Sequence, residues 1–80
     1  MAEKQQTSAA FGAVLRTYRR ERGLTQEQLS ERVEVVHSFI SGIELGTRQP
    51  NLQMILKLAA ALGVSSGEIM TAVEKHLADK

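Results

Sequence analysis

The sequence predicts a small all-α domain, and three observations support that fold class. Its 80 residues include one proline and only 4% aromatic side chains. No segment alternates apolar and polar residues in the way that a half-buried strand does. Helix-capping residues recur along the chain, and apolar side chains follow them at helical spacing. We therefore expect five helices in one domain over residues 8–80, with residues 1–7 as a flexible tail.

The first helix is predicted to begin after Ser8 and to end at Gly23. Its buried stripe follows the i, i+3, i+4, i+7 spacing of one helix face and consists of Phe11, Val14, Leu15 and Tyr18. Glycine readily adopts the left-handed conformation that ends many helices, so Gly23 is a suitable stop.

A second, short helix is predicted over residues 26–33. Thr25 and Gln28 form a capping-box pattern, in which each side chain can bond a free backbone amide of the other residue. Leu29 and Val33 are the inward positions of this helix. Ser30 lies where the helix would cross the next one, and only a small side chain lets two helices approach closely.

A third helix is predicted from about Val36 to Leu45, with Ile40 and Ile43 inward and Gly46 as its stop. Two short helices about three residues apart pack across each other at a steep angle. Such a pair leaves one helix face free for a DNA major groove, or it forms an ordinary helical hairpin inside a bundle. Spacing alone leaves both interpretations open.

Two further helices complete the fold. Asn51 caps the fourth, Gly63 ends it, and its apolar stripe consists of Leu52, Ile55, Leu58, Ala59 and Leu62. Ser65 and Glu68 make a second capping-box pattern, which predicts a fifth helix over about 66–77.

The fifth helix is the predicted dimerisation surface. Its apolar side chains recur at i, i+1, i+4 and i+8 and are Ile69, Met70, Val73 and Leu77. Four helices already fill the core of so small a domain, so part of this stripe should face a second chain. In the alternative, Ile69 and Val73 complete the core and the other two are exposed.

Composition excludes several classes of site. Cysteine is absent and the two histidines are far apart in sequence, so no metal site is expected. No paired carboxylates, no nucleophile with a base and no glycine-rich phosphate loop stand at usable spacing, so we expect neither an enzyme nor a cofactor. No apolar run approaches the ~20 residues of a membrane span, and the N-terminus lacks the apolar stretch of a signal peptide. A cytoplasmic protein without a membrane partner is expected.

The formal net charge is +1, but the charges are unevenly distributed. Residues 16–22 hold a cluster of four arginines, which could meet phosphates or could be a solvated helix face. The cluster alone does not decide between them.

A resemblance to a known family favours DNA binding. The stretch from Leu15 to Val64 contains RGLTQEQL, ISGIELG, the RQPNL loop and KLAAALGV. In this combination it resembles the helix-turn-helix domain of the lambda-repressor-like group, also called the Cro/repressor or XRE type. The resemblance implies a five-helix DNA-binding domain with the helix-turn-helix at about 25–45. Its third helix would read bases, usually as a homodimer on a two-fold operator.

The chain departs from the family pattern at two positions. Glu34 stands where the family usually has glycine, and a non-glycine residue in a left-handed turn costs on the order of 1 kcal/mol. Either that turn is distorted or the strain is accepted. Val36 stands where the family often caps the recognition helix with serine, so that helix should begin later or use Ser38 or a neighbouring group.

Helix geometry then suggests which residues contact DNA bases. Ile40, Ile43 and Glu44 share one side of the third helix, which leaves the other side free. The predicted base contacts on that free side are His37, Ser38 and Ser41, with Val36 against a thymine methyl group. A merely solvated His37, or one that touches phosphate, is the alternative.

Phosphate contacts are expected from the flanks of the recognition helix. Gln26 occupies the first turn of a helix, where backbone amides favour an anion, and its counterpart in the family clamps a phosphate. The remaining predicted phosphate contacts lie in or after the next loop and are Thr47, Arg48, Gln49 and Asn51.

Arg19 and Glu44 are expected to form a structural ion pair. Arg19 follows Leu15 by four residues and Glu44 follows Ile40 by four, so both lean toward buried stripes. Opposite charges at two inward positions should pair. The family resemblance agrees, since its members often carry Arg and Glu at these positions.

Taken with the resemblance, these features predict a DNA-binding transcriptional regulator of the repressor or controller type. It would bind an inverted-repeat operator in double-stranded DNA as a homodimer. Eighty residues leave no evident room for a small-molecule effector domain. The alternative is an antitoxin-like protein that neutralises a partner toxin and regulates its own operon.

Overall fold

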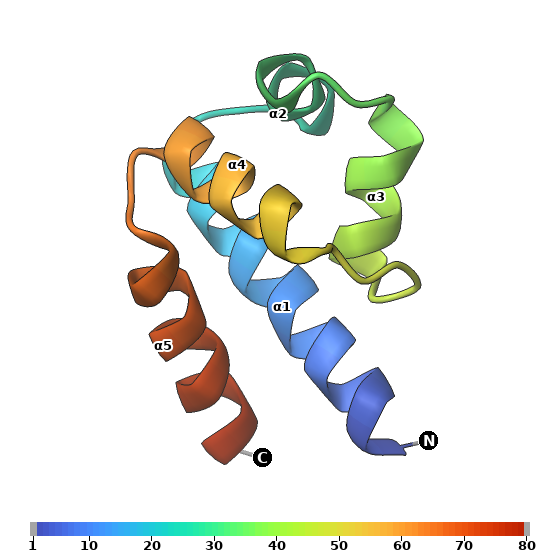
Figure 1. The fold of residues 1–80 in the computed structure, drawn as a ribbon, viewed down its shortest axis with the longest axis vertical. Coiled ribbons are helices and arrows are strands. Elements are labelled where there is room, and N and C mark those ends of the chain that lie inside the picture. The colour runs from blue at the N-terminus through green and yellow to red at the C-terminus, as the bar shows by residue number, and fades with distance from the viewer. Residues whose placement is uncertain (1, 80) are drawn as a thin grey trace.

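The computed structural model describes residues 2–79, which form five helices and no strand (Figure 1). In chain order the helices are α1 (Ala2–Glu21), α2 (Gln26–Val33), α3 (His37–Leu45), α4 (Leu52–Leu62) and α5 (Ser66–Ala78). The all-α, five-helix fold predicted from the sequence is confirmed. None of these helices is by itself long and apolar enough to cross a membrane; only α4 and α5 joined across a bend of 104° pass that test.

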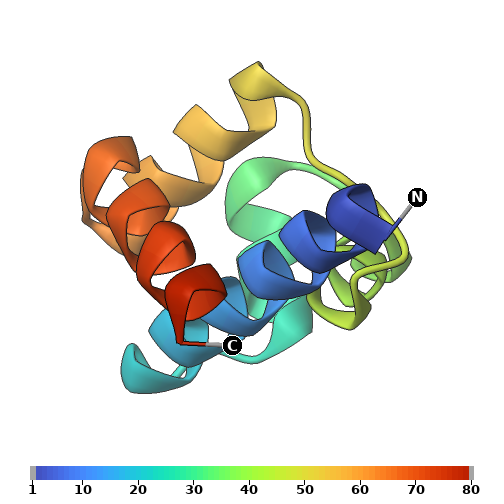
Figure 2. The same ribbon diagram turned by 90° about the horizontal axis from the view of Figure 1, so that it is seen from below.

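Helix α1 is the centre of the arrangement. It packs against α3 on one side and α5 on the other, as Figure 2 shows from below. Helix α2 contacts both α3 and α4, and α4 contacts α5. The pair α2–α3 is therefore held at one side of the molecule by α1 and α4.

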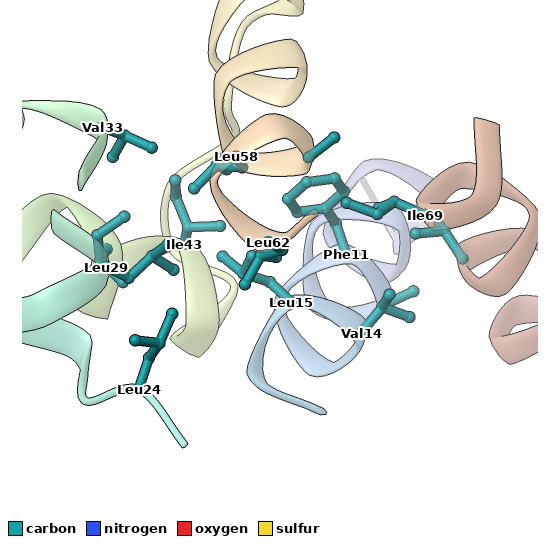
Figure 3. Packing of buried hydrophobic residues seen from close by; sticks show 14 residues of the cluster. Phe11, Val14, Leu15, Leu24, Leu29, Val33, Ile43, Leu58, Leu62 and Ile69 are labelled. Carbon is teal, nitrogen blue, oxygen red and sulfur yellow. The ribbon is translucent and has the colours of Figure 1, made fainter. Parts of the chain in front are cut away.

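The core draws on all five helices and on the turn after α1 (Figure 3). Its buried side chains are Ala10, Phe11, Val14, Leu15, Leu24, Leu29, Val33, Ile40, Ile43, Leu58, Ala59, Leu62, Ile69 and Val73. Most of the predicted stripes are thus buried as expected. Leu52 is an exception, at 75% exposed, because the buried residues of α4 all lie in its second half.

Helix starts follow the predicted caps, with one difference. Thr25 and Gln28 form the complete capping box, with bonds of 3.0 and 2.9 Å. Ser65 accepts a bond from the Glu68 amide at 3.0 Å, but the reciprocal bond is missing. The Glu68 carboxylate instead accepts a bond from the Tyr18 hydroxyl at 3.1 Å, which ties α5 to α1.

Helix α1 begins at Ala2, earlier than the expected start after Ser8. Residues 2–7 are mostly good helix formers and contain no breaker, so the helix continues through them. Ser8 is buried rather than capping a helix end. Met1 of the predicted tail and Lys80 of the predicted domain lie outside the described residues.

Helix α5 differs from the expected dimerisation surface. Ile69 and Val73 are 0% and 2% exposed within a single chain, so neither is available to a partner and that part of the prediction is wrong. The physical reason is that α5 packs along α1 and turns this stripe into the core. Leu77 is partly buried against the core, and Met70 is exposed.

Candidate nucleic-acid interface

The turn between α2 and α3 keeps its left-handed conformation although Glu34 stands in place of glycine, which is the second of the two outcomes considered for this turn. Glu34 has φ 61° and ψ 46°, and it is the one non-glycine residue with positive φ in the described chain. The Val35 amide donates to the Ser30 carbonyl at 3.0 Å, which closes the turn. Ser30 is buried, and its hydroxyl donates to the Glu27 carbonyl at 2.6 Å. The small side chain is therefore buried with its polar atom satisfied.

Helix α3 begins one residue later than predicted. Val36 occupies the N-cap position without any side-chain cap bond, and the first helical residue is His37. The Val36 side chain is 69% exposed. An apolar group therefore stands in solvent directly before the helix, where an apolar contact with another molecule would bury it.

One face of α3 is turned to solvent. Ile40 and Ile43 are fully buried, whereas the predicted base contacts lie on the opposite side. His37 and Ser38 are exposed and Ser41 is half-exposed. The structure thus brings the four predicted base-contact residues together on one solvent-facing surface at the start of α3.

Arg19 and Glu44 form the expected ion pair between α1 and α3. Arg19 Nε lies 2.6 Å from Glu44 Oε2, and Nη2 donates to Oε1 at 2.9 Å. The third guanidinium nitrogen donates to the Leu24 carbonyl at 2.7 Å. The two side chains are only 9% and 3% exposed. Hydrogen bonding to Glu44 raises the pKa of Arg19 above its ordinary value, so the guanidinium stays charged.

Gln26 extends this pair toward the exposed face. Its Nε2 donates to Glu44 Oε1 at 2.9 Å, and its Oε1 lies 3.0 Å from Nε2 of His37. The predicted phosphate-binding, structural and base-reading residues are therefore parts of one hydrogen-bonded chain. Sequence spacing predicted each role separately and did not predict this connection.

The loop after α3 is bound to the end of that helix. The Gly42 carbonyl accepts bonds from the amides of Thr47 and Arg48 and from the Thr47 hydroxyl, at 3.0, 3.1 and 3.2 Å. Gln49 is exposed. Asn51 caps α4 through its side-chain oxygen, which accepts from the Met54 amide at 2.8 Å. The predicted phosphate contacts of this loop thus lie beside α3.

Arg48 is held against α3 by a contact that the sequence analysis missed. Its guanidinium carbon lies 5.5 Å from the centre of the Phe39 ring. Its alkyl chain crosses Gly42, where an added Cβ would lie 3.0 Å from it. An aromatic residue three positions before a glycine, with arginine shortly after the helix, was the available signal. The stacking holds the positive charge at the edge of the exposed face.

Half of the basic cluster at 16–22 is structural rather than free for phosphate. Arg19 is buried in the ion pair. Arg22 donates to the Leu62 carbonyl at 2.8 Å and lies 5.1 Å from the Tyr18 ring centre. Arg16 and Arg20 remain exposed.

Gly12 is a further position that sequence reasoning did not identify. A Cβ at this position would lie 2.7 Å from the Glu44 carbonyl oxygen and closer still to that of Ile43. The backbone of α1 at Gly12 therefore lies directly against the backbone carbonyls at the end of α3, and only glycine permits so close an approach. A glycine inside an otherwise helical pattern was the signal for it.

The surface made by α3, the start of α2 and the loop offers hydroxyl, amide, imidazole and guanidinium groups. These groups form hydrogen bonds with base edges and with phosphate oxygens. Among residues 2–79 no group of three or more His, Asp or Glu could hold a metal ion. The groups on this surface are suited to recognising another molecule through hydrogen bonds.

Comparison with known proteins agrees with this geometry. Residues 15–69 match the family model described as helix-turn-helix. An uncharacterised HTH-type transcriptional regulator, y4dJ, of Sinorhizobium fredii is 40% identical over 57 residues, which cover 71% of this chain and 74% of the relative.

Solved structures of two restriction-modification controller proteins are similar. C.AhdI from Aeromonas hydrophila aligns with a TM-score of 0.75 and 39% identity, over 78% of this chain and 94% of that protein. The tetramer of C.Esp1396I in complex with its natural 35 base-pair operator aligns with a TM-score of 0.80 and 25% identity, over 89% of this chain and 93% of that one.

Proposed function

This chain belongs to the helix-turn-helix family of DNA-binding transcriptional regulators, and we propose that it binds an inverted-repeat operator as a homodimer. The family is one of non-enzymatic regulators, so the chain is not an enzyme. The observation that supports the proposal is the solvent-facing surface at the start of α3, with groups on both sides of it that could bond phosphate. As a regulator of operators, the protein would act in the cytoplasm, on the nucleoid.

In this proposal the N-terminal turn of α3 enters the major groove. His37 and Ser38 meet base edges first and Ser41 follows further along the helix. Val36 contacts a thymine methyl group, which would bury its exposed side chain. Because these side chains are few and short, part of the specificity comes from DNA shape.

The phosphate backbone is held on both sides of that groove. At the start of α2, Gln26 has a second amide hydrogen that neither Glu44 nor His37 uses. Beyond α3, the stacked Arg48 and the exposed Gln49 face the other strand, with Thr47 and Asn51 beside them. A helix N-terminus and a preorganised guanidinium are both suited to phosphate oxygens.

The dimer contact that we propose is centred on the first half of α4. Leu52 and Leu56 are 75% and 54% exposed and lie one turn apart on the same helix face. Met70 on α5 is also exposed and lines a hollow together with Ile55 of α4. The first half of α4 follows directly after the loop beside α3. Contact there between two copies would set the two recognition helices about 34 Å apart, one DNA turn.

Footprinting on the DNA upstream of the protein's own coding region tests the binding mode. We expect protection of two half-sites one helical turn apart. If the dimer makes roughly 6–10 phosphate contacts, its affinity should fall about 10³- to 10⁵-fold between 50 and 200 mM salt. Affinity that does not change over this range would rule out the backbone contacts. Co-purification of a second protein without specific DNA binding would favour the antitoxin alternative.

Sedimentation of charge variants tests the dimer contact. Leu52→Glu and Leu56→Glu should sediment as monomers with unchanged helical content, because like charges would face each other across a two-fold axis. Gln53→Glu is the matched control, since it adds the same charge at an exposed position of the same helix. Leu77→Glu tests the α5 surface expected from the sequence. Monomers for Leu77→Glu alone would return the interface to α5.

A further inference from the structure

We propose that the chain Arg19–Glu44–Gln26 fixes the tautomer of His37 and thereby fixes which bases His37 accepts at one operator position. This inference rests on the proposed function for its DNA-binding half. Its other half concerns the free protein and can be measured without DNA. Beyond its place as a base contact, His37 would have the direction of its hydrogen bonds controlled from the interior of the domain.

The first link is the carboxylate of Glu44. Two N–H groups of Arg19 bond its two oxygens at 2.6 and 2.9 Å, and the side chain is 3% exposed. The carboxylate is therefore fixed in position and ionised. An ionised carboxylate only accepts hydrogen bonds.

The second link is the side-chain amide of Gln26. Its Nε2 lies 2.9 Å from Glu44 Oε1. The reversed amide would place two acceptor oxygens against each other, so only the NH₂ group can face Glu44. The amide oxygen of Gln26 must then face His37, at 3.0 Å from Nε2 of the ring. Because that oxygen is an acceptor, Nε2 of His37 must carry the proton.

The third link is the other ring nitrogen. In a neutral imidazole with the proton on Nε2, Nδ1 is an acceptor. Within residues 2–79 this nitrogen has no hydrogen-bond partner, and the residue is exposed at the start of α3. In the major groove, an acceptor pairs with the amino group of cytosine N4 or adenine N6. Neutral His37 therefore selects cytosine or adenine over guanine or thymine at the strand position that it faces.

The first experiment measures the tautomer in the free protein by ¹⁵N NMR of the histidine rings above pH 8. We expect His37 to carry its proton on Nε2 alone. Gln26→Met removes the link and leaves the Arg19–Glu44 bonds in place, so the two tautomers should become mixed. His76, the other histidine, is an internal comparison that the variant should not change. A His37 ring protonated on Nδ1, or unaffected by Gln26→Met, would overturn the relay.

The second experiment selects operator variants from a randomised half-site at pH 8, with the parent and with single variants. With the parent, one position of each half-site should prefer cytosine or adenine by about three- to tenfold in affinity. Gln26→Met should weaken that preference and His37→Ala should abolish it, whereas His76→Gln should retain it. A preference for guanine or thymine at that position, or a preference that His37→Ala leaves unchanged, would overturn the base-reading role.

The two experiments separate the possible failures. Absence of specific DNA binding would overturn the proposed function and the base-reading role, while the NMR result would still test the relay. Specific binding with a mixed His37 tautomer would overturn the relay and leave the proposed function standing.

Discussion

Replacement of Glu44 by alanine should remove much of the stability of this domain. The carboxylate accepts two bonds from Arg19 and one from Gln26. After Glu44→Ala, the guanidinium keeps only its bond to the Leu24 carbonyl, at 2.7 Å. A nearly buried positive charge is then left without a counter-charge between α1 and α3.

The magnitude follows from the burial of the pair. Removing one partner of a buried ion pair costs about 3–5 kcal/mol. The side chains here are 9% and 3% exposed and one guanidinium bond remains, so we expect the lower end, about 3 kcal/mol. A domain of this size has a total stability of about 4–12 kcal/mol. The melting temperature should fall by roughly 12–24 °C.

Urea unfolding followed by circular dichroism measures this loss. Glu21→Ala is the matched control, because it removes an exposed pair in which Arg22 Nη1 lies 3.5 Å from Glu21 Oε1. Such surface pairs contribute about 0–1 kcal/mol. Arg19→Met combined with Glu44→Leu should recover much of the loss, since no charge is then left buried. If Glu44→Ala melts like the parent, the pair does not stabilise the fold and the reasoning is refuted.

Three smaller changes follow from backbone and side-chain geometry. Glu34→Gly should stabilise the fold by about 0.5–1 kcal/mol in urea unfolding. A non-glycine residue in the left-handed conformation costs about 1–2 kcal/mol, which exceeds the free-energy cost of the entropy that glycine adds to the unfolded chain. A lower urea midpoint would contradict this. Gly12→Ala should destabilise by about 1–3 kcal/mol because its Cβ meets the Ile43 carbonyl, and unchanged stability would show that α1 can shift at little cost. Desolvation and the bond to Glu68 raise the pKa of Tyr18. The neutral phenol therefore stabilises the fold below about pH 10, and this contribution is lost as the pH rises through the pKa of Tyr18 in the folded protein. Tyr18→Phe should therefore lose less stability than the parent between pH 9 and pH 12, and parallel losses would refute the assignment.

The sequence predicted most of the helix boundaries because the caps act locally. Asn51 and the pair of Thr25 with Gln28 bond amides three residues away, so their positions alone mark helix starts. Glu68 departed from its pattern because a residue 50 positions earlier, Tyr18, competes for its carboxylate. A competition of that kind depends on how the helices pack, which local spacing does not contain.

The candidate site was predicted less completely than the fold. The side of α3 that holds Ser38 and Ser41 followed from helical spacing, and the inward lean of Arg19 and Glu44 predicted their pairing. The bond between Gln26 and His37 joins residues of two helices, and only their crossing brings the side chains together. Ile69 and Val73 of the α5 stripe pack into the core of their own chain, because periodicity shows that a face is buried and does not show what covers it.

In the proposed binding mode, the start of α3 reads bases while the loop after it holds the backbone. The affinities of Ser38→Ala and Arg48→Ala for a set of single base-pair operator variants distinguish these two roles. Ser38→Ala should change the preference at one position by about 1–3 kcal/mol, whereas Arg48→Ala should weaken binding to all variants alike. Lys75→Ala, which removes an exposed charge on α5, should do neither. An unchanged preference profile for Ser38→Ala, with base discrimination lost in Arg48→Ala, would contradict the claim.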